Sequence, residues 1–310
     1  MLLDRRRFLV GSAASTFLLA CQRSGSTSKT ATIREIDHVV AAQASRDGAG
    51  VALRRSIGSG QLPNLDPFLL LDEIHSSDPA DYTAGFPQHP HRGFETVSYV
   101  LKGGFRHKDS VGNHGLIADG GAQWMTAGHG IVHEEMPQRT TTSELWGLQL
   151  WVNLPAARKM IRPRYQDIGA AAVPELDLAD ARVRLVAGQL GSTRGPVDGI
   201  DIRPTMFDAA LLPHAEFRHS LPGGDTAFVY VLDGALRFGE VGTQVSAGEL
   251  AVLGKGSSIV AWTETGGRFL LVSGTPLNEP IARRGPFVMN TDAELQQAFE
   301  DYRSGSLTQL

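Results

Sequence analysis

The sequence predicts an all-β protein: two similar antiparallel β-barrels of the jelly-roll type in tandem, followed by a short C-terminal helix. Short apolar segments recur along the chain and are separated by turn residues, in keeping with 35 glycines and 16 prolines. Between about residues 33 and 290 the sequence contains no heptads, charged blocks or long helical patterns. Many short strands with regular turns are typical of an antiparallel barrel or sandwich.

Five segments are expected in the 310-residue chain. The linker among them contains Pro163 and Pro174, which interrupt regular structure. In chain order the segments are an export signal and tether (1–32), a first barrel domain (33–155), a linker (156–180), a second barrel domain (181–290) and a C-terminal helix with its tail (291–310).

The N-terminus resembles a targeting signal and is excluded from the fold prediction. Asp4–Leu9 resembles a twin-arginine export motif, and the apolar run after it is too short for a stable membrane anchor. Leu18–Cys21 resembles a lipobox, and Gln22–Ser28 would form a flexible tether. We therefore expect export through the twin-arginine route to the periplasm or cell envelope, with a lipid anchor at Cys21. The alternative is an ordinary cleaved signal in which Cys21 is incidental.

Composition places the chain among globular proteins, with 42% hydrophobic and 20% charged residues. The formal net charge of −4 provides no large basic surface, so no nucleic-acid partner is expected. Cys21 is the single cysteine, so the chain can form no internal disulfide. Stabilisation is therefore expected from packing, with a bound metal as a further candidate.

Three strands are predicted in the first barrel, because each run is rich in apolar residues and is bounded by turn residues. Lys102–Gly104 turns the first of them, and Gly128–Gly130 follows the second. The three strands are Thr96–Leu101, Gln123–Ala127 and Leu145–Val152.

The second barrel repeats this plan. The Asp233–Gly234 pair predicts a hairpin between Phe228–Leu232 and Ala235–Phe238, because Asp-Gly favours a tight two-residue turn. Further strands are expected at Val245–Leu253, Ser258–Trp262 and Phe269–Gly274.

The chain ends in a predicted helix at Asp292–Tyr302. Asn290, Thr291 and Asp292 are candidate N-caps, because their side chains accept hydrogen bonds from the free N–H groups at a helix start. The polar residues after the helix are expected to fray.

The motif that carries chemistry is His89-Pro90-His91, which is answered later in the chain by His133 and Glu135. Side chains two residues apart on a strand point to the same face of the sheet. If the two strands face each other, three imidazoles and one carboxylate meet at one point. That is the ligand set of a mononuclear metal site of the Fe(II) type. Pro90 cannot donate to a strand ladder, so the pair is expected at a sheet edge or strand start.

Two further glutamates lie near these histidines. Glu134 stands between His133 and Glu135 and is expected to point to the opposite face. Glu95 and Glu135 cannot easily both bind a metal that already has three imidazoles, so one of them is expected outside the ligand set. Glu95 would then orient a ligand imidazole or the substrate.

Other histidines are not expected to bind a metal. His107 and His114 are assigned to a solvated turn, and His129 to an exposed one. His214 and His219 belong to the second barrel, where no His-x-His or His-x-Glu partner occurs. We therefore expect the second barrel to be free of metal and to serve in packing, in closing the first barrel or in partner binding.

These motifs resemble the pirin family of bicupins over about residues 34 to 302. One departure is Asp119–Gln123, which replaces the usual Gly-Asp-x-Gln turn and alters a hairpin rather than a ligand. The most specific stretches are Phe86–Thr96, Gln123–Gly128, Gly130–Pro137, Leu148–Asn153 and Gly285–Thr291.

The resemblance implies two tandem cupin domains with one metal in the N-terminal cupin. Its ligands would be His89, His91, His133 and Glu135, which leaves Glu95 outside the ligand set. Fe(II) is the expected metal. Nickel, copper, manganese and zinc are alternatives, because imidazole-rich sites accept several metals.

Several pirins are similar to quercetin 2,3-dioxygenase in activity, so the resemblance implies a ring-opening dioxygenase. Its partners would be O2 and a small aromatic, flavonol-like substrate, and Glu135 could act as the base that takes the substrate hydroxyl proton. The alternatives are a non-catalytic iron-binding redox sensor or interaction protein of the cell envelope, and a structural metal barrel used as a scaffold. Other pirins are transcriptional co-regulators, a role that does not fit an exported protein.

Overall fold

The computed structural model describes residues 31–138 and 143–309. The predicted twin-arginine motif, the lipobox at Cys21 and the tether lie outside the described residues and stay predictions. In the described part of the chain, no helix is both long enough and apolar enough to cross a membrane.

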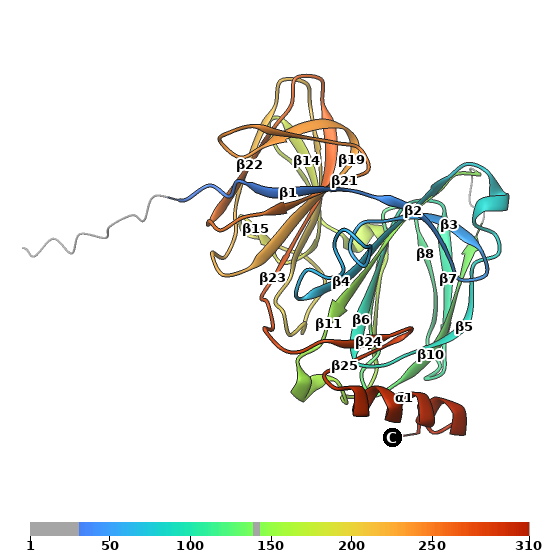
Figure 1. Cartoon of the computed structure of the whole chain (residues 1–310). Helices are drawn as coiled ribbons and strands as arrows, with labels where there is room; N and C mark the ends of the chain where they lie inside the picture. Colours follow the sequence, from blue (N-terminus) through green and yellow to red (C-terminus); the bar gives the residue numbers. More distant parts are fainter. Residues whose placement is uncertain (1–30, 139–142, 310) are drawn as a thin grey trace, which may run out of the picture. The chain divides into compact units, whose positions relative to one another are not determined.

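The predicted fold class is confirmed, because the described residues form two β-barrels and a C-terminal helix (Figure 1). In the first barrel, a seven-stranded sheet (β12-β9-β6-β11-β4-β3-β2) faces a four-stranded sheet (β5-β10-β7-β8). The strands of this barrel are β2 (Gln43–Asp47), β3 (Val51–Arg55), β4 (Phe68–Ser76), β5 (Phe86–His91), β6 (Phe94–Lys102), β7 (Gly104–Asp109), β8 (His114–Ala118), β9 (Ala122–Thr126), β10 (Ile131–Gln138), β11 (Leu145–Asn153) and β12 (Arg164–Ile168).

The second barrel is one ten-stranded sheet with the path β1-β21-β19-β23-β17-β14-β13, to which β18, β20 and β22 attach. A turn at Ala247–Gly248 divides the predicted strand Val245–Leu253 into β20 and β21. The elements are β1 (Ile36–Ala41), β13 (Glu175–Asp177), β14 (Ala181–Ala187), β17 (Thr205–Leu211), β18 (Glu216–Ser220), β19 (Thr226–Phe238), β20 (Thr243–Ser246), β21 (Glu249–Leu253), β22 (Ser258–Trp262) and β23 (Gly267–Gly274), with a small hairpin of β15 (Gln189–Leu190) and β16 (Thr193–Arg194), followed by β24 (Ala282–Arg284), β25 (Phe287–Met289) and α1 (Asp292–Ser304).

The predicted hairpin at Asp233–Gly234 is wrong, because β19 is one continuous strand of 13 residues. The first half of β19 pairs with β21 and β23, and its second half pairs with β20 and β22. The register with β23 shifts between Val231 and Asp233, and Gly234 takes a positive φ of 72°. The Asp-Gly pair therefore bends the strand at a barrel corner instead of reversing it.

The predicted domain boundaries need correction, because the two barrels exchange strands from distant parts of the chain. β1, predicted in the first domain, pairs with β21 of the second barrel. The predicted linker 156–180 is not irregular: it supplies β12 to the first barrel and β13 to the second. The C-terminal segment returns to the first barrel, where the Val288 N–H donates to the Arg92 carbonyl at 3.1 Å.

The C-terminal helix is confirmed, and Thr291 is its N-cap. The Thr291 hydroxyl accepts from the Glu294 N–H at 3.2 Å, and the Glu294 carboxylate accepts from the Thr291 N–H at 2.9 Å. Arg92, the residue that follows β5, forms an ion pair of 2.6 Å with Asp301. This ion pair fixes the helix against the first barrel beside β5.

The two barrels share a core along the outer face of the seven-stranded sheet. Tyr99 donates its hydroxyl hydrogen to Asp208 of the second barrel at 2.8 Å, and Tyr99 and Val97 belong to one buried cluster with residues of both barrels. Alternation along β6 then turns Phe94 and Ser98 to the opposite face, toward the interior of the first barrel.

Candidate metal centre

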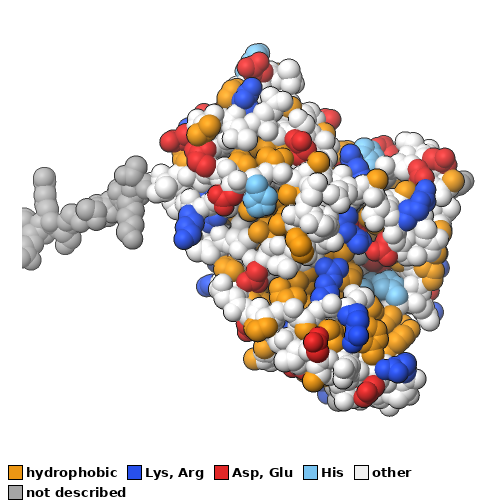
Figure 2. All heavy atoms as spheres, in the orientation of Figure 1, with side chains coloured by type: hydrophobic (Ala, Val, Ile, Leu, Met, Phe, Trp, Pro, Cys, Tyr) orange, Lys and Arg blue, Asp and Glu red, His pale blue; other side chains and the backbone are white. Residues whose placement is uncertain are grey.

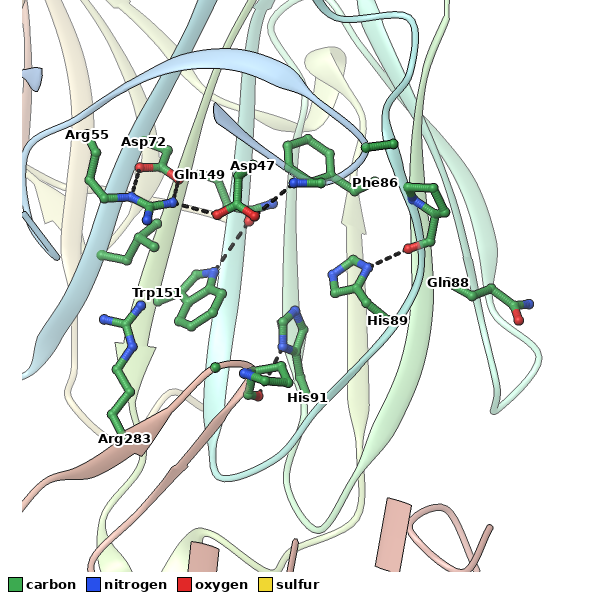
Figure 3. Close-up of a pocket in the computed structure, with 16 residues that line it drawn as sticks. Asp47, Arg55, Asp72, Phe86, Gln88, His89, His91, Gln149, Trp151 and Arg283 are labelled. Carbon is green, nitrogen blue, oxygen red and sulfur yellow. Dashed lines mark hydrogen bonds and ion pairs between the residues drawn. The ribbon is translucent and has the colours of Figure 1, made fainter. Parts of the chain in front are cut away.

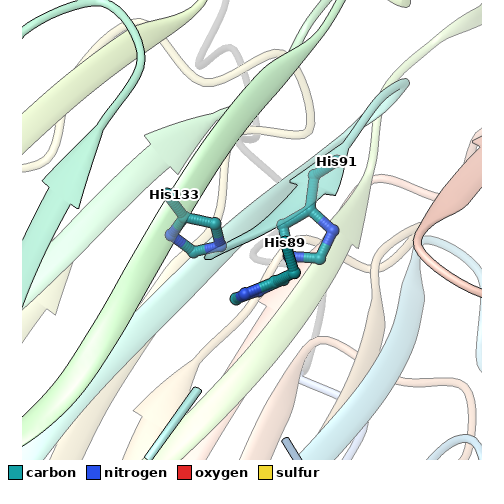
Figure 4. Close-up of side chains that lie close together, drawn as sticks. All are labelled: His89, His91 and His133. Carbon is teal, nitrogen blue, oxygen red and sulfur yellow. The ribbon is translucent and has the colours of Figure 1, made fainter. Parts of the chain in front are cut away.

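Two neighbouring strands of the first barrel bring three imidazoles together (Figure 4). His133 on β10 lies directly opposite His89 on β5, and His91 follows two residues along β5. One ring nitrogen from each of the three lies within 4.8 Å of the others. We call these three residues the imidazole triad. β5 is an edge strand of its sheet, as Pro90 predicts.

Two members of the imidazole triad have a fixed tautomer. The Nδ1 of His89 lies 2.8 Å from the Pro87 carbonyl, and the Nδ1 of His91 lies 3.2 Å from the Pro286 carbonyl. Because a carbonyl only accepts, each Nδ1 must carry the hydrogen, and each Nε2 keeps a free lone pair. A backbone carbonyl behind an imidazole is the usual partner of a metal-binding histidine.

His133 supplies the strongest sign that the triad suits a metal ion. Its side chain is buried, and neither of its ring nitrogens has a hydrogen-bond partner among the described residues. Burial, together with the neighbouring imidazoles, holds the pKa of His133 and of His91 well below the usual range. Both rings are therefore neutral at pH 7, and a bound cation would satisfy lone pairs that are otherwise left unpaired.

Glu135 is oriented toward the barrel interior, as the alternation along β10 predicts. Its carboxylate accepts from the Ser98 hydroxyl at 2.8 Å and from the Gln149 amide at 2.7 Å. Glu134 points to the other face and lies 3.9 Å from Arg106, in line with the prediction. The Glu135 oxygens are not part of the 4.8 Å cluster, so its role as fourth ligand stays a prediction.

The predicted role of Glu95 is not supported by its contacts. Its carboxylate accepts from the Thr126 hydroxyl at 2.6 Å, and it shares the outer face of β6 with Val97. Its hydrogen bonds involve none of the three imidazoles. Burial raises the pKa of Glu95 to about 7 against the opposing effect of the Thr126 hydrogen bond.

Two predictions about other histidines are wrong. His129 is buried in the turn before β10 rather than exposed. His107 is fully buried, and its two nitrogens contact Asp109 at 3.1 Å and Gln123 at 3.2 Å. The His107 ring lies 5.4 Å from the His133 ring, so it packs behind the triad. The alternating pattern of β7, in which His107 and Asp109 share a face, could have identified it. His114 is exposed, as predicted.

A cavity of about 560 Å³ opens beside His89 and His91 (Figure 3). This volume suits a small organic ligand. The indole of Trp151 lines the cavity 5.1 Å from the His91 ring, and its N–H donates to Gln149 at 3.3 Å. The remaining walls are partly apolar (Ala49, Leu70, Phe86, Pro87, Pro286) and partly polar (Asp47, Arg55, Asp72, Gln88, Arg283).

The second barrel contains no comparable cluster among the residues that the structure describes. His219 stands alone against Phe207, with ring centroids 5.1 Å apart, and burial lowers its pKa to about 4. The interior is filled by four phenylalanines whose paired rings lie 5.3 to 6.4 Å apart: Phe207, Phe217, Phe238 and Phe269.

Comparison with known proteins agrees with this division into two cupins. The family model of pirin matches residues 50–152, and the model of the pirin C-terminal cupin domain matches residues 206–308. A Pseudomonas aeruginosa relative, whose name assigns quercetin 2,3-dioxygenase activity provisionally, is 44% identical over 84% of this chain and 93% of its own. A pirin-like protein of Solanum lycopersicum is also 44% identical, over 86% of this chain and 90% of its own. The solved structure of a quercetin 2,3-dioxygenase from Acinetobacter baumannii superposes with a TM-score of 0.80 at 32% identity, over 89% of this chain and 98% of its own.

Proposed function

The chain belongs to the pirin family, and we propose that it is a metal-dependent dioxygenase that opens a flavonol-type, quercetin-like ring with O2. The observation that carries the proposal is an imidazole triad with free Nε2 lone pairs beside a cavity of about 560 Å³. Similarity to proteins named as quercetin 2,3-dioxygenases supports the same reaction class.

In this proposal, His89, His91 and His133 hold the metal, and Glu135 either completes the ligand set or stays beside it. A metal held there would supply Lewis acidity, which would lower the pKa of a substrate hydroxyl. Fe(II) is the proposed metal, although nickel, copper, manganese or zinc would suit the same imidazoles.

The protein side chains then have separate tasks. Glu135 takes the hydroxyl proton of the substrate, because its carboxylate is already oriented by Ser98 and Gln149. Trp151 and Phe86 offer flat apolar walls to an aromatic ring and displace water from the reacting face. Gln149 links the two parts of the site, since it accepts from Trp151 and donates to Glu135.

A second candidate function is a non-catalytic iron-binding redox sensor. One observation favours it: His89 is only partly buried and lies on an edge strand. A change in the charge of the metal would therefore alter the electrostatic potential at the protein surface. A sensor needs no open cavity for a substrate, which is why we rank it second.

The test is metal analysis of the full chain purified without tags or added metal, followed directly by oxygen-electrode measurements with quercetin. We expect about one iron per chain and oxygen uptake that depends on quercetin. Stoichiometric metal without uptake would favour the sensor, and protein without any metal would overturn the proposal.

We also propose that the protein works in the periplasm or cell envelope, on the basis of the twin-arginine motif and the lipobox at Cys21. Fractionation of cells that express the full chain, with Arg5 and Arg6 both changed to Lys as the comparison, tests this. Retention of the wild type in the cytoplasm would reject it.

A further inference from the structure

A fixed cation lies on the wall of the cavity, one aromatic ring away from the imidazole triad (Figure 3). The guanidinium carbon of Arg283 on β24 lies 4.8 Å from the centroid of the Trp151 ring. On its other side, the Trp151 ring lies 5.1 Å from the His91 ring. The C-terminal segment, which crosses back to the first barrel, therefore adds a positive charge to the cavity that His89 and His91 line.

Arg283 has no ion-pair partner among the described residues, unlike its neighbour Arg55. The Arg55 guanidinium binds both oxygens of Asp72 at 2.7 Å and one oxygen of Asp47 at 2.7 Å. The other Asp47 oxygen accepts from the Gly48 N–H at 2.8 Å. Every carboxylate oxygen of these two aspartates is thus already engaged, and they attract Arg283 only from a distance.

The hydrogen bonding of Arg283 is also incomplete. In the part of the chain that the structure covers, its guanidinium donates one hydrogen bond, from Nη1 to the Leu69 carbonyl at 2.8 Å. A guanidinium has five N–H groups arranged to bind a carboxylate or another anionic oxygen in two-point fashion. Burial and the nearby Arg55 lower the pKa of Arg283, while Asp72 and Asp47 oppose this shift without forming an ion pair with it.

We propose that Arg283 recognises an anionic group of the substrate at the end of the cavity away from the triad. The preferred substrate would then be a planar aromatic with two acidic functions: a hydroxyl for the triad and a second, ionised group for Arg283. Trp151 stacks with the guanidinium and separates the two polar ends with an apolar surface. This inference rests on the proposed function, because it assigns the substrate class of the same site.

The experiment compares two probes that differ in one charge: 3-hydroxyflavone-4′-carboxylate and its methyl ester. Isothermal titration calorimetry on the full chain, loaded with Zn(II), measures both dissociation constants without any turnover. We expect the wild type to bind the carboxylate at least about tenfold more tightly than the ester, as befits a charge-assisted two-point contact.

Arg283→Gln should reduce that preference to within about twofold, and Arg283→Lys should give an intermediate value because the charge stays but the planar fork is lost. The matched control is Arg284→Gln. It removes the same charge from the adjacent position of β24, where the Arg284 side chain lies over Phe299 at 5.0 Å, and it should keep the wild-type preference. Equal zinc content in all four proteins confirms that the triad is intact.

Equal binding of both probes by the wild type, or an unchanged preference in Arg283→Gln, would overturn the assignment of Arg283 while leaving a flavonol site in place. Binding of neither probe would reject both the assignment and the proposed function. Should Arg283→Gln fail to fold, the comparison of wild type with Arg283→Lys still decides, because an identical preference in these two proteins would exclude recognition by the guanidinium fork.

Discussion

The two barrels have the same kind of strand framework, but the interior of the first contains polar side chains and that of the second is apolar. The first encloses His133, Glu135 and Gln149 and opens into a cavity, whereas the second is packed with Phe207 and Phe269 and their neighbours. The framework itself therefore does not decide between a site and a core. A few inward-facing positions on β5 and β10 decide, and the corresponding interior of the second barrel then contributes stability.

The largest effect that would sharpen this contrast is the loss of an imidazole from the triad. His133→Ala should lower bound metal from about one ion per chain to less than about one tenth, because a ligand with no other partner is removed. Oxygen uptake should fall with it. His219→Ala in the second barrel is the matched control and should leave both unchanged, as measured by elemental analysis and an oxygen electrode. Full metal retention by His133→Ala would place the site elsewhere.

The next effect belongs to the second barrel. Phe207 is fully buried, so Phe207→Ala should lower the free energy of unfolding by about 3–5 kcal/mol while the metal content per folded chain stays the same. Denaturant unfolding measures the loss. Leu212→Ala, at a position 57% exposed, should change stability by less than about 0.5 kcal/mol. A loss of metal in Phe207→Ala would contradict the assignment of metal binding to the first barrel alone.

A smaller effect is the pH dependence of stability that Glu95 causes from the outer face of β6. The pKa of Glu95 is raised to about 7, so in the folded state it keeps its proton to a higher pH than in the unfolded chain. The stabilisation of the folded state by protonated Glu95 is complete below the unfolded pKa near 4.5 and is lost as the pH rises through about 7. Between pH 5 and 8, the metal-free wild type should lose up to about 3 kcal/mol more than Glu95→Gln.

Denaturant unfolding at both pH values measures this difference, with Glu134→Gln as the control for removal of a charge at a partly exposed position. Metal content should be the same in both variants. Loss of metal from Glu95→Gln would instead support the prediction from the sequence that Glu95 orients a ligand of the metal.

The smallest effect concerns the support of Glu135. Gln149→Leu removes the amide that donates to the Glu135 carboxylate at 2.7 Å, and it should weaken metal binding by about 10- to 100-fold. Competition with a chelator measures the affinity. Gln166→Leu, which removes an amide bonded to the Asp198 carbonyl, should have no effect. An unchanged affinity in Gln149→Leu would argue that Glu135 is outside the ligand set.

The triad could be predicted from the sequence because its geometry is local. His89 and His91 are two residues apart on one strand, and only the pairing of β5 with β10 had to be supplied. The helix at Asp292–Ser304 could also be predicted from local sequence, since Thr291 and Glu294 form a capping box three residues apart.

The sequence could not show which face of the sheet Glu95 occupies, because alternation does not carry through a turn. Gly93, with φ of 86°, separates β5 from β6 and resets which residues face inward. A side chain at Gly93 would also collide with the Val288 carbonyl oxygen, so this turn is shaped by the C-terminal segment. That segment, and Arg283 with it, reaches the site through pairing between distant residues, on which local patterns carry no information.

The most direct test of the central contrast is an anomalous difference map from crystals of the full chain as purified, recorded at the absorption edge of the metal that elemental analysis identifies. We predict one peak per chain, bonded to His89, His91 and His133 in the first barrel. A peak in the second barrel, or one held by Asp47 and Asp72 instead of the triad, would contradict the assignment of the metal centre.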